Sequence, residues 1–164
     1  HPAWIEPAEW LGGAAGEELH LISHQPNGRL HSQLETGEAS RAEKRAGREQ
    51  VRLHPGDAAT RGITDGMTVR LWNARGACLA TALVTDAVAP GVAILPTGAW
   101  FTPGGNSGLD LSGNPNVLTL DIGSSAFGQG CSAHTCLVRI EPHGGEAPDA
   151  ITAYQHQLAE LLPA

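Results

Sequence analysis

Two thiols and an imidazole lie within a short segment near the end of the chain, at Cys131, His134 and Cys136. Thiolate sulfur and imidazole nitrogen are ligands that zinc prefers, so a structural zinc site is one chemistry to consider. Structural zinc takes four ligands, commonly as two closely spaced pairs, and the remaining cysteine, Cys78, is far away in a strand-like segment. We therefore expect buried, unpaired thiols near a functional loop, and no metal ligands.

Histidines and serines are numerous enough to suggest a hydrolytic site, which would need an activated nucleophile. The sequence contains no Gly-x-Ser-x-Gly elbow. The glycine-rich stretch 102–108 lacks the Lys and the following Ser or Thr of a phosphate-binding P-loop, and no Rossmann fingerprint follows a strand. Neither a hydrolase nor a nucleotide site of these two kinds is expected.

The composition is that of a chain with many turns and few charges. Its 164 residues, 41% of them hydrophobic, suffice for one sizeable core but leave little room for a second. Glycine (21) and proline (11) interrupt the chain often, and 16% charged residues are too few for a solvated helical bundle. The net charge of -7 argues against a nucleic-acid-binding module. No apolar run approaches the roughly 20 residues that cross a bilayer.

Five of the ten basic residues fall in one stretch, at Arg41, Lys44, Arg45, Arg48 and Arg52. Glutamates are interleaved with them, a pattern typical of a solvated surface. We therefore expect this stretch to be exposed. The alternative is a docking face for another domain or for an anionic ligand.

The coarse element pattern favours a compact β-barrel. Strand patterns occur over residues 19–23, 51–53, 68–72, 77–84, 92–95 and 137–140. Short helices are expected at 7–11 and at 58–61, where Gly62 ends the helix, and a longer one at 150–162. Short strands without regular strand-helix alternation are typical of a closed barrel. The polar stretches 23–29, 30–48 and 97–116 are long for connectors, and such loops often carry function.

Several motifs give the chain a family resemblance. The segment His54 to Arg70 resembles the double-psi barrel signature of molybdopterin oxidoreductases. It is joined, in the family's order, by Ser23-His24-Gln25-Pro26, Arg29 to Leu34, Thr97 to Phe101, Gly113 to Thr119 with Asp121 to Gly123, and Gln129-Gly130-Cys131. The Arg-Leu-His-Ser-Gln run points to the branch of dimethyl sulfoxide, trimethylamine N-oxide and biotin sulfoxide reductases.

This resemblance implies a mainly β fold, a six-stranded double-psi β-barrel with short helices and long polar loops. It implies that the chain closes over one side of a bis(molybdopterin guanine dinucleotide) molybdenum cofactor, in an enzyme that reduces S-oxides or N-oxides. The molybdenum ligand and the substrate funnel lie in earlier domains of such enzymes. We therefore expect this chain to hold cofactor without any catalytic or metal-ligating residue, and its partners to be the remaining domains of the same enzyme.

The resemblance also suggests boundaries: a linker over 1–18, the cofactor-binding barrel over 19–141, and a partly helical tail over 142–164. Because the chain starts at His1 and its one methionine is Met67, we expect a natural amino terminus to be missing. Such enzymes occur in the bacterial cytoplasm and periplasm, so the compartment stays open.

The candidate cofactor-binding residues are polar and lie on the motif loops. They are Ser23, His24, Gln25, Arg29, His31, Ser32, Gln33, Asn116, Ser125 and Gln129. The planar amides of Asn116 and Gln129 can donate and accept hydrogen bonds along a pterin or guanine edge. Arg29 can make a forked contact with a pyrophosphate, and backbone N–H groups of glycine-containing loops can bind anions whatever the net charge.

Each candidate has a structural alternative. Asn116 can hold a turn after Pro115, and Arg29 and His31 can bond local carbonyls. Ser125 and Gln129 can be capping or turn residues. Trp100, between two of the motifs, is expected to pack in the core or between domains.

Two other functions remain open at this point. One is a stand-alone double-psi barrel that acts as a protein-interaction module with no redox role. The other is a different molybdopterin dinucleotide enzyme, such as a formate dehydrogenase.

Overall fold

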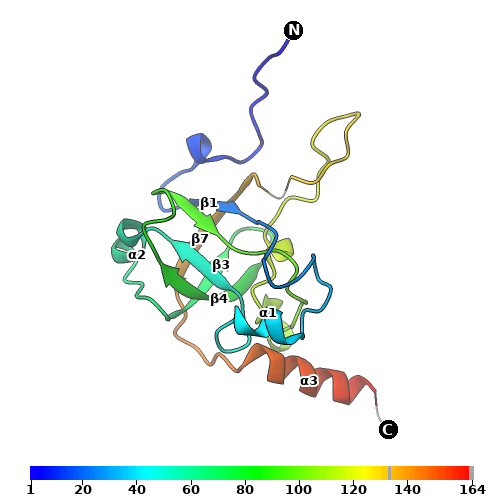
Figure 1. Cartoon of the computed structure of the whole chain (residues 1–164). Helices are drawn as coiled ribbons and strands as arrows, with labels where there is room; N and C mark the ends of the chain where they lie inside the picture. Colours follow the sequence, from blue (N-terminus) through cyan, green and yellow to red (C-terminus); the bar gives the residue numbers. More distant parts are fainter. Residues whose placement is uncertain (133, 163–164) are drawn as a thin grey trace.

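Six strands pair in the order β2-β5-β1-β7-β3-β4, and β2 also pairs with β4, which closes the sheet into a barrel (Figure 1). The computed structural model describes residues 1–132 and 134–162. The strands are β1 (Leu19–Ile22), β2 (Gln50–Leu53), β3 (Thr68–Trp72), β4 (Ala77–Val84), β5 (Val92–Ile94), β6 (Leu109–Asp110) and β7 (Cys136–Pro142). The short strand β6 adds to β4 beside the ring. The prediction of a mainly β, six-stranded barrel is confirmed.

Three α-helices and three 3-10 helices accompany the strands in the described part of the chain. They are α1 (Glu38–Ala42), α2 (Pro55–Thr60), α3 (Ala150–Leu161), η1 (Leu11–Gly13), η2 (Gly105–Ser107) and η3 (Pro115–Val117). The helix α2 starts earlier than the predicted 58–61 because Pro55 suits a first helical position and the His54 Nδ1 accepts a 3.1 Å hydrogen bond from the Gly56 N–H. The short helical turn predicted at 7–11 lies later than expected, because the 3-10 helix η1 begins at Leu11, the last residue of that range.

The barrel interior is apolar and continuous. Strand residues that alternate inward supply most of it, and β4 is buried on both faces over Ala77–Ala82 because other chain segments cover it. The core contains Leu19, Leu21, Val51, Leu53, Val69, Leu71, Ala80, Ala93, Leu118 and Val138, among others. Such a core gives the loops a rigid base.

Taken in sequence order, the six barrel strands alternate in direction, and most of the long loops lie at one end of the barrel. Strands β1, β3 and β5 run toward this end, and β2, β4 and β7 run away from it. The segments 23–36, 43–49, 73–76, 95–102, 115–132 and 134–135 therefore lie toward this end, on the right in Figure 1, while α2 lies at the opposite end. We call these segments the loop end.

After β7 the chain returns toward the loop end. The His143 N–H donates to the Thr68 carbonyl, and the Ala150 N–H, at the start of α3, donates to the Ala46 carbonyl. The predicted helix at 150–162 is present as α3, and residues 163 and 164 of the predicted tail lie outside the described residues. No described helix is long and apolar enough to cross a membrane.

Candidate functional site at the loop end

The loop 23–36 leaves β1 and makes a tight first turn. Ser23 is buried and His24 half-buried, and the Gln25 Nε2 donates a 3.0 Å hydrogen bond to the Arg29 carbonyl, which closes the turn around Pro26. Asn and Gly follow the proline, as expected of a turn. Three of the candidate residues are thus fixed at the rim of the barrel.

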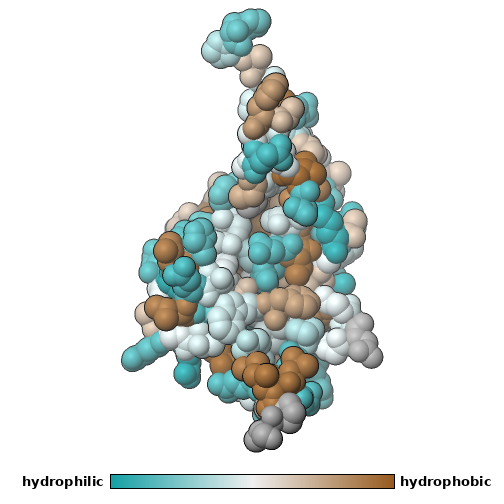
Figure 2. Space-filling model, turned by 90° about the vertical axis from the view of Figure 1, so that its right-hand side faces the viewer, coloured by the Kyte–Doolittle hydropathy of each residue, from teal (hydrophilic) through white to brown (hydrophobic). Residues whose placement is uncertain are grey.

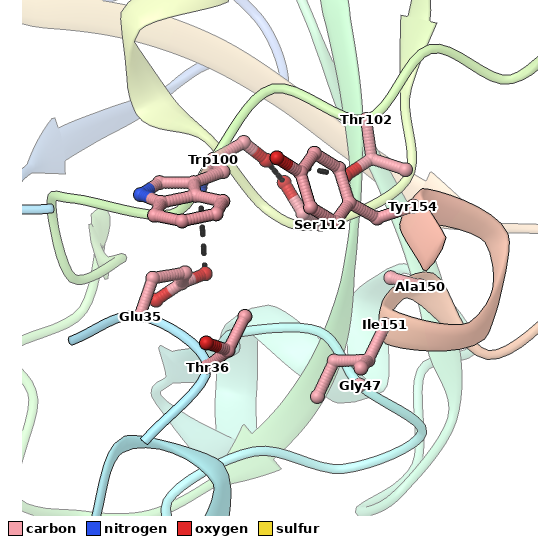
Figure 3. Close-up of a pocket in the computed structure, with 9 residues that line it drawn as sticks. All are labelled: Glu35, Thr36, Gly47, Trp100, Thr102, Ser112, Ala150, Ile151 and Tyr154. Atoms are coloured by element: carbon pink, nitrogen blue, oxygen red, sulfur yellow. Dashed lines mark hydrogen bonds between the residues drawn. The ribbon is translucent and has the colours of Figure 1, made fainter. Parts of the chain in front are cut away.

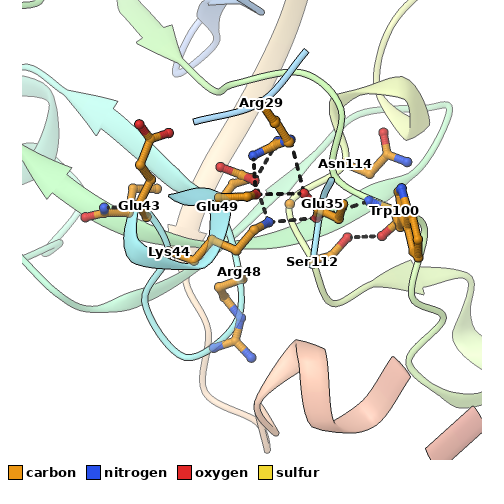
Figure 4. Close-up of polar contacts among 12 residues, drawn as sticks. Arg29, Glu35, Glu43, Lys44, Arg48, Glu49, Trp100, Ser112 and Asn114 are labelled. Carbon is orange, nitrogen blue, oxygen red and sulfur yellow. Dashed lines mark hydrogen bonds and ion pairs between the residues drawn. The ribbon is translucent and has the colours of Figure 1, made fainter. Parts of the chain in front are cut away.

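Arg29 lies at the centre of a buried group of four charges (Figure 4). Its guanidinium pairs with Glu49 at 2.8 Å and with Glu35 at 3.1 Å, and the Lys44 ammonium bridges the same two carboxylates at 2.5 and 2.7 Å. The hydroxyl of Ser40 accepts from Arg29 at 3.1 Å. All four charged side chains are at most 8% exposed, and two positive charges balance two negative ones. Such a group tolerates burial because each charge is paired.

The same guanidinium also joins two loops. Its Nη2 donates to the Thr97 carbonyl at 2.8 Å and its Nε to the His31 carbonyl at 3.2 Å. Arg29 thus bonds local groups, which is the structural alternative considered for it, although it is buried and not on the surface. Arg29 is buried beneath these loops, and its hydrogen bonds hold the loop 23–36 against the loop 95–102.

The basic stretch from Arg41 to Arg52 is not the fully solvated surface that the sequence predicts. Lys44 is buried in the four-charge group, and Arg48 is 1% exposed. The Arg48 guanidinium donates to the Leu111 carbonyl at 3.2 Å and to the Pro148 carbonyl, partners more than 60 residues away in sequence. Burial lowers the pKa of Arg48, while Asp110 and Asp149 act in the opposite direction. The expectation of exposure is wrong for these two residues because charge pattern along the chain does not reveal distant partners.

His31, Ser32 and Gln33 form an exposed crest on the first loop. His31 has φ of 49°, a left-handed conformation uncommon outside glycine. Its carbonyl lies against Gly98 of the neighbouring loop, where φ is 92°. The crest is therefore held by backbone contact, and its side chains stay exposed.

Asn116 belongs to η3, whose start is fixed by Asp110. The buried carboxylate accepts from the backbone N–H groups of Thr102, Gly113 and Asn114 at 2.7–2.8 Å. Burial raises the pKa of Asp110 despite these hydrogen bonds, which act in the opposite direction. The Asn114 side chain caps η3 by accepting from the Asn116 N–H, so the Asn116 side chain is left exposed.

Ser125 and Gln129 lie on an extension bridged between Gly123 and Cys131, coloured yellow in Figure 1. The Ser125 hydroxyl accepts from the Gly128 N–H at 2.7 Å, and the Gln129 Nε2 donates to the Ser125 carbonyl at 3.1 Å. Both side chains are exposed. Their internal hydrogen bonds resemble the turn role considered for them, and the Gln129 carboxamide oxygen can still accept a hydrogen bond from a ligand.

The thiols are only partly as expected. Cys78 and Cys136 are buried, but Cys131 is exposed on the extension, and Ala133 of the same segment lies outside the described residues. Burial raises the pKa of Cys136 to about 11, although Arg75 lowers it. The expectation of burial is wrong for Cys131 because its polar, glycine-rich neighbours do not reveal how far this segment extends from the barrel.

Among the buried polar atoms that have no hydrogen-bond partner within the described chain are Ser23 Oγ, His24 Nδ1 and Gln50 Oε1, all close to the loop end. His24 and Gln50 line a recess together with Asn27 and Arg52. Burial lowers the pKa of His24, and nearby Arg52 lowers it further. Gln50 is not among the cofactor-binding residues predicted from the sequence, because it is the first residue of a strand and lies in none of the family motifs.

These three atoms are of kinds that can bind the polar edges of a heterocycle. A hydroxyl, an imidazole nitrogen and an amide oxygen offer both donors and acceptors, and leaving them unpaired in the interior costs free energy. A molybdopterin nucleotide has amide-like edges that need such partners. The residues present at the loop end therefore fit that group.

The surface of the loop end is also unusually apolar in places. Figure 2 faces this side of the molecule and shows hydrophobic patches among polar surface. Exposed large hydrophobic residues on the loop-end segments are Leu30, Leu34, Trp100, Phe101, Ile122 and Phe127. Exposure of this kind is typical of a surface that contacts something else.

The ten predicted residues divide into two groups in space. Those of 23–36 lie side by side with the loop 95–102, as the Arg29, His31 and Gly98 contacts show. Asn116 and the extension leave the same end of the barrel, but no hydrogen bond joins their side chains to the first group in the described structure. The predicted segments thus share one end without forming one bonded cluster.

Comparison with known proteins agrees with this picture. The model of the molydopterin dinucleotide binding domain family matches residues 19–137. The chain is 77% identical to the biotin sulfoxide reductase of Cereibacter sphaeroides over 163 residues, which are 99% of this chain and 22% of that protein. It is 50% identical to trimethylamine-N-oxide reductase 1 of Escherichia coli (strain K12), over 88% of this chain and 18% of that protein.

Further comparisons extend the range of relatives. A dimethyl sulfoxide/trimethylamine N-oxide reductase of Cereibacter sphaeroides is 42% identical over 94% of this chain and 19% of that protein. The acetylene hydratase from Pelobacter acetylenicus has a similar fold, with a TM-score of 0.59 and 17% identity over 76% of this chain and 18% of that one. This likeness of fold agrees with the predicted fold class, a mainly β barrel.

The chain spans about a fifth of the length of these curated relatives. The family match begins at the first residue of β1 and ends within β7, so it covers most of the barrel and the segments of the loop end. This chain belongs to the molydopterin dinucleotide binding domain family.

Proposed function

We propose that this chain is the cofactor-binding domain of a larger molybdenum oxidoreductase that reduces S-oxides or N-oxides, and that it binds bis(molybdopterin guanine dinucleotide). The observation that carries this proposal is the family match together with 77% identity to a biotin sulfoxide reductase. The relatives' greater length supports a catalytic body outside this chain. Residues 19–141 would form the cofactor-binding unit, with 1–18 as a linker and 142–164 as a tail.

The loop end would supply binding, not chemistry. When bound, the molybdenum cofactor supplies two-electron oxygen-atom transfer. Ser23, His24 and Gln50 would meet polar edges of the nucleotide, because their buried atoms lack other partners among the described residues. Asn116 and Gln129 would contribute planar amides from the other side of the loop end.

Positive charge for the phosphates would come from outside the buried four-charge group. Arg29 and Lys44 are already neutralised by Glu35 and Glu49. Arg52, at the recess lined by His24, forms no ion pair with any described residue and can face an anion, although the carboxylates of Glu43 and Glu49 line the same recess. Backbone N–H groups of the exposed crest add to this, and the remaining domains of the enzyme would cover the exposed apolar residues.

The test uses the full-length enzyme that contains this chain, produced in a host that makes the cofactor. Metal analysis should find molybdenum, acid release should yield GMP, and reduced methyl viologen should drive reduction of biotin sulfoxide, trimethylamine N-oxide or dimethyl sulfoxide. A protein that is folded but carries another nucleotide would contradict the guanine form. A molybdenum-loaded protein that reduces none of the three compounds would contradict the activity.

Individual contacts are tested by nucleotide content. Asn116→Ala and Gln129→Ala should each lower the GMP recovered per enzyme, since each removes a planar amide. Gln155→Ala, an exposed amide on α3, is the matched control and should leave the recovery unchanged. Equal recovery in all three variants would remove Asn116 and Gln129 from the proposed site.

A further inference from the structure

The helix α3 follows the part of the chain that the family model matches, yet it contacts the loops of the proposed cofactor site. We propose that α3 is a positioning element for these loops, and that Tyr154 acts through Trp100 on the crest formed by His31, Ser32 and Gln33. The functional consequence of this inference rests on the proposed function, whereas the link from α3 to the crest rests on contacts within the chain alone.

The start of α3 is seated on the turn before β2. Gly47 in that turn has φ of 72°, and a Cβ atom there would lie 2.6 Å from the Ile151 nitrogen and 2.9 Å from the Ala150 nitrogen. The Ala150 N–H donates 3.1 Å to the Ala46 carbonyl. Only glycine allows this close approach, so the helix begins at a defined place.

Two side-chain contacts fix the helix along its length. The buried Arg48 guanidinium donates to the Pro148 carbonyl, just before α3, and to the Leu111 carbonyl on the barrel side. Further along the helix, the Gln157 Nε2 donates 2.7 Å to the Pro103 carbonyl. The helix is therefore attached at both its start and its later turns.

Between these attachments Tyr154 meets Trp100 (Figure 3). The ring centroids are 5.3 Å apart with the planes at 64°, an edge-to-face arrangement. On its other side, the Trp100 Nε1 donates 2.8 Å to the Ser32 carbonyl, and its backbone N–H donates 3.3 Å to a Glu35 carboxylate oxygen. One tryptophan thus connects α3 to the crest and to the buried four-charge group.

The backbone of Trp100 is held independently of Tyr154. Its carbonyl accepts hydrogen bonds from the hydroxyls of Ser112 and Thr102, at 2.5 and 3.3 Å. The tryptophan is 37% exposed, and its indole contacts the Tyr154 ring on one side and the Ser32 carbonyl on the other. Loss of the tyrosine ring would therefore free the indole, and with it the Ser32 carbonyl, while the barrel below keeps its structure.

The experiment measures hydrogen exchange in the full-length, cofactor-loaded enzyme. Tyr154→Leu should speed exchange of the amides over 31–37, which include the Gln33 and Gly37 donors of this loop, by roughly tenfold. Tyr154→Phe keeps the ring and should match the wild type. Leu161→Ala, at an exposed position of the same helix, is the control and should also match it.

A second variant separates the link from the stability of α3. Trp100→Phe keeps an aromatic ring beside Tyr154 but removes the Nε1 donor to Ser32, so it should loosen 31–37 while amides of α3 keep their protection. If Tyr154→Leu unfolds α3, exchange over 31–37 in that variant still reports on the helix as a whole, and Trp100→Phe reports on the step from Trp100 to the crest. Unchanged exchange over 31–37 in Trp100→Phe would overturn the inference.

Nucleotide retention gives the functional readout. During prolonged dialysis, Tyr154→Leu and Trp100→Phe should lose GMP-yielding cofactor several-fold faster than Tyr154→Phe. If even the wild type holds no such cofactor, the proposed function fails, and the exchange data still decide whether α3 positions the crest. If cofactor loss is equal in all variants although exchange differs, the positioning role is overturned.

Discussion

A Cβ atom added to Gly98 would lie 1.9 Å from the carbonyl oxygen of His31. Two loops that are far apart in sequence therefore touch through their backbones at the loop end. The contact leaves no room for a side chain at Gly98, and beside it His31 has φ of 49°, a left-handed conformation that is uncommon outside glycine.

The substitution Gly98→Ala should destabilise the chain by about 3 kcal/mol or more, because it adds a backbone clash to an unfavourable φ. Gly62→Ala is the matched control, since Gly62 also has positive φ but a Cβ atom there would meet nothing within 4 Å. It should cost only about 1 kcal/mol. Urea unfolding of both variants measures the difference, and equal losses would show that the close approach is relaxed at no cost.

Removing Arg29 should be much more costly than removing an exposed arginine. Arg29→Met leaves Glu35 and Glu49 with too little positive charge in a buried place, for an expected loss of about 3–5 kcal/mol. Arg45→Met breaks an exposed pair with Asp65, whose side chains are 48% and 52% exposed, and should cost under about 1 kcal/mol. Chemical denaturation tests both, and similar losses would mean that the four-charge group contributes no more than a surface pair.

Stability should fall as the pH drops below the ordinary histidine range because of His24. Burial and Arg52 lower the pKa of His24 in the folded chain, so the unfolded chain takes up the proton first. The stabilisation is present above the unfolded value of about 6.5 and is lost as the pH falls from there through the folded pKa. His24→Gln should flatten this part of the profile of unfolding free energy against pH relative to the unsubstituted chain. A profile unchanged by His24→Gln would contradict the assignment.

The three thiols should differ in reactivity. Cys131 is exposed and should be labelled when the folded chain is treated briefly with a maleimide. Cys78 and Cys136 are buried and should react only on unfolding. Burial raises the pKa of both buried thiols, to about 11 for Cys136, which lowers their thiolate fraction further. Mass spectrometry after brief labelling should find one modified cysteine, and Cys131→Ser should abolish that label. Rapid double labelling would contradict the described burial.

Much of the barrel is predictable from local pattern. The strands expected at 68–72 and 77–84 agree with β3 and β4. Apolar and polar residues alternate along 68–72, and the turn at Asn73 to Gly76 separates the two strands. The strand β6 is missed inside the stretch 97–116, since two residues carry no periodicity and their pairing partner, β4, is about 30 residues earlier. The presence of β3 and β4 can be predicted from the local sequence, whereas the pairing of a short strand such as β6 with a distant strand cannot.

The loop end is predictable only in part. Motif order identifies the segments, and the alternating strand directions bring them to one end of the barrel. Side-chain environment is not predictable in the same way: Arg48 and Lys44 are buried by carbonyls and carboxylates that fold back from elsewhere, and Gln50 and Tyr154 carry no motif. Whether the ten candidate residues hold the nucleotide stays a prediction.

Closure of the barrel also sets an order of assembly. Strand β1 pairs with β7, more than 110 residues later, and β2 pairs with both β4 and β5, so the ring waits for distant partners. Pairings of such long sequence separation form slowly, since the intervening chain must first be confined. During synthesis the ring of strands therefore cannot close until residues 136–142 have left the ribosome.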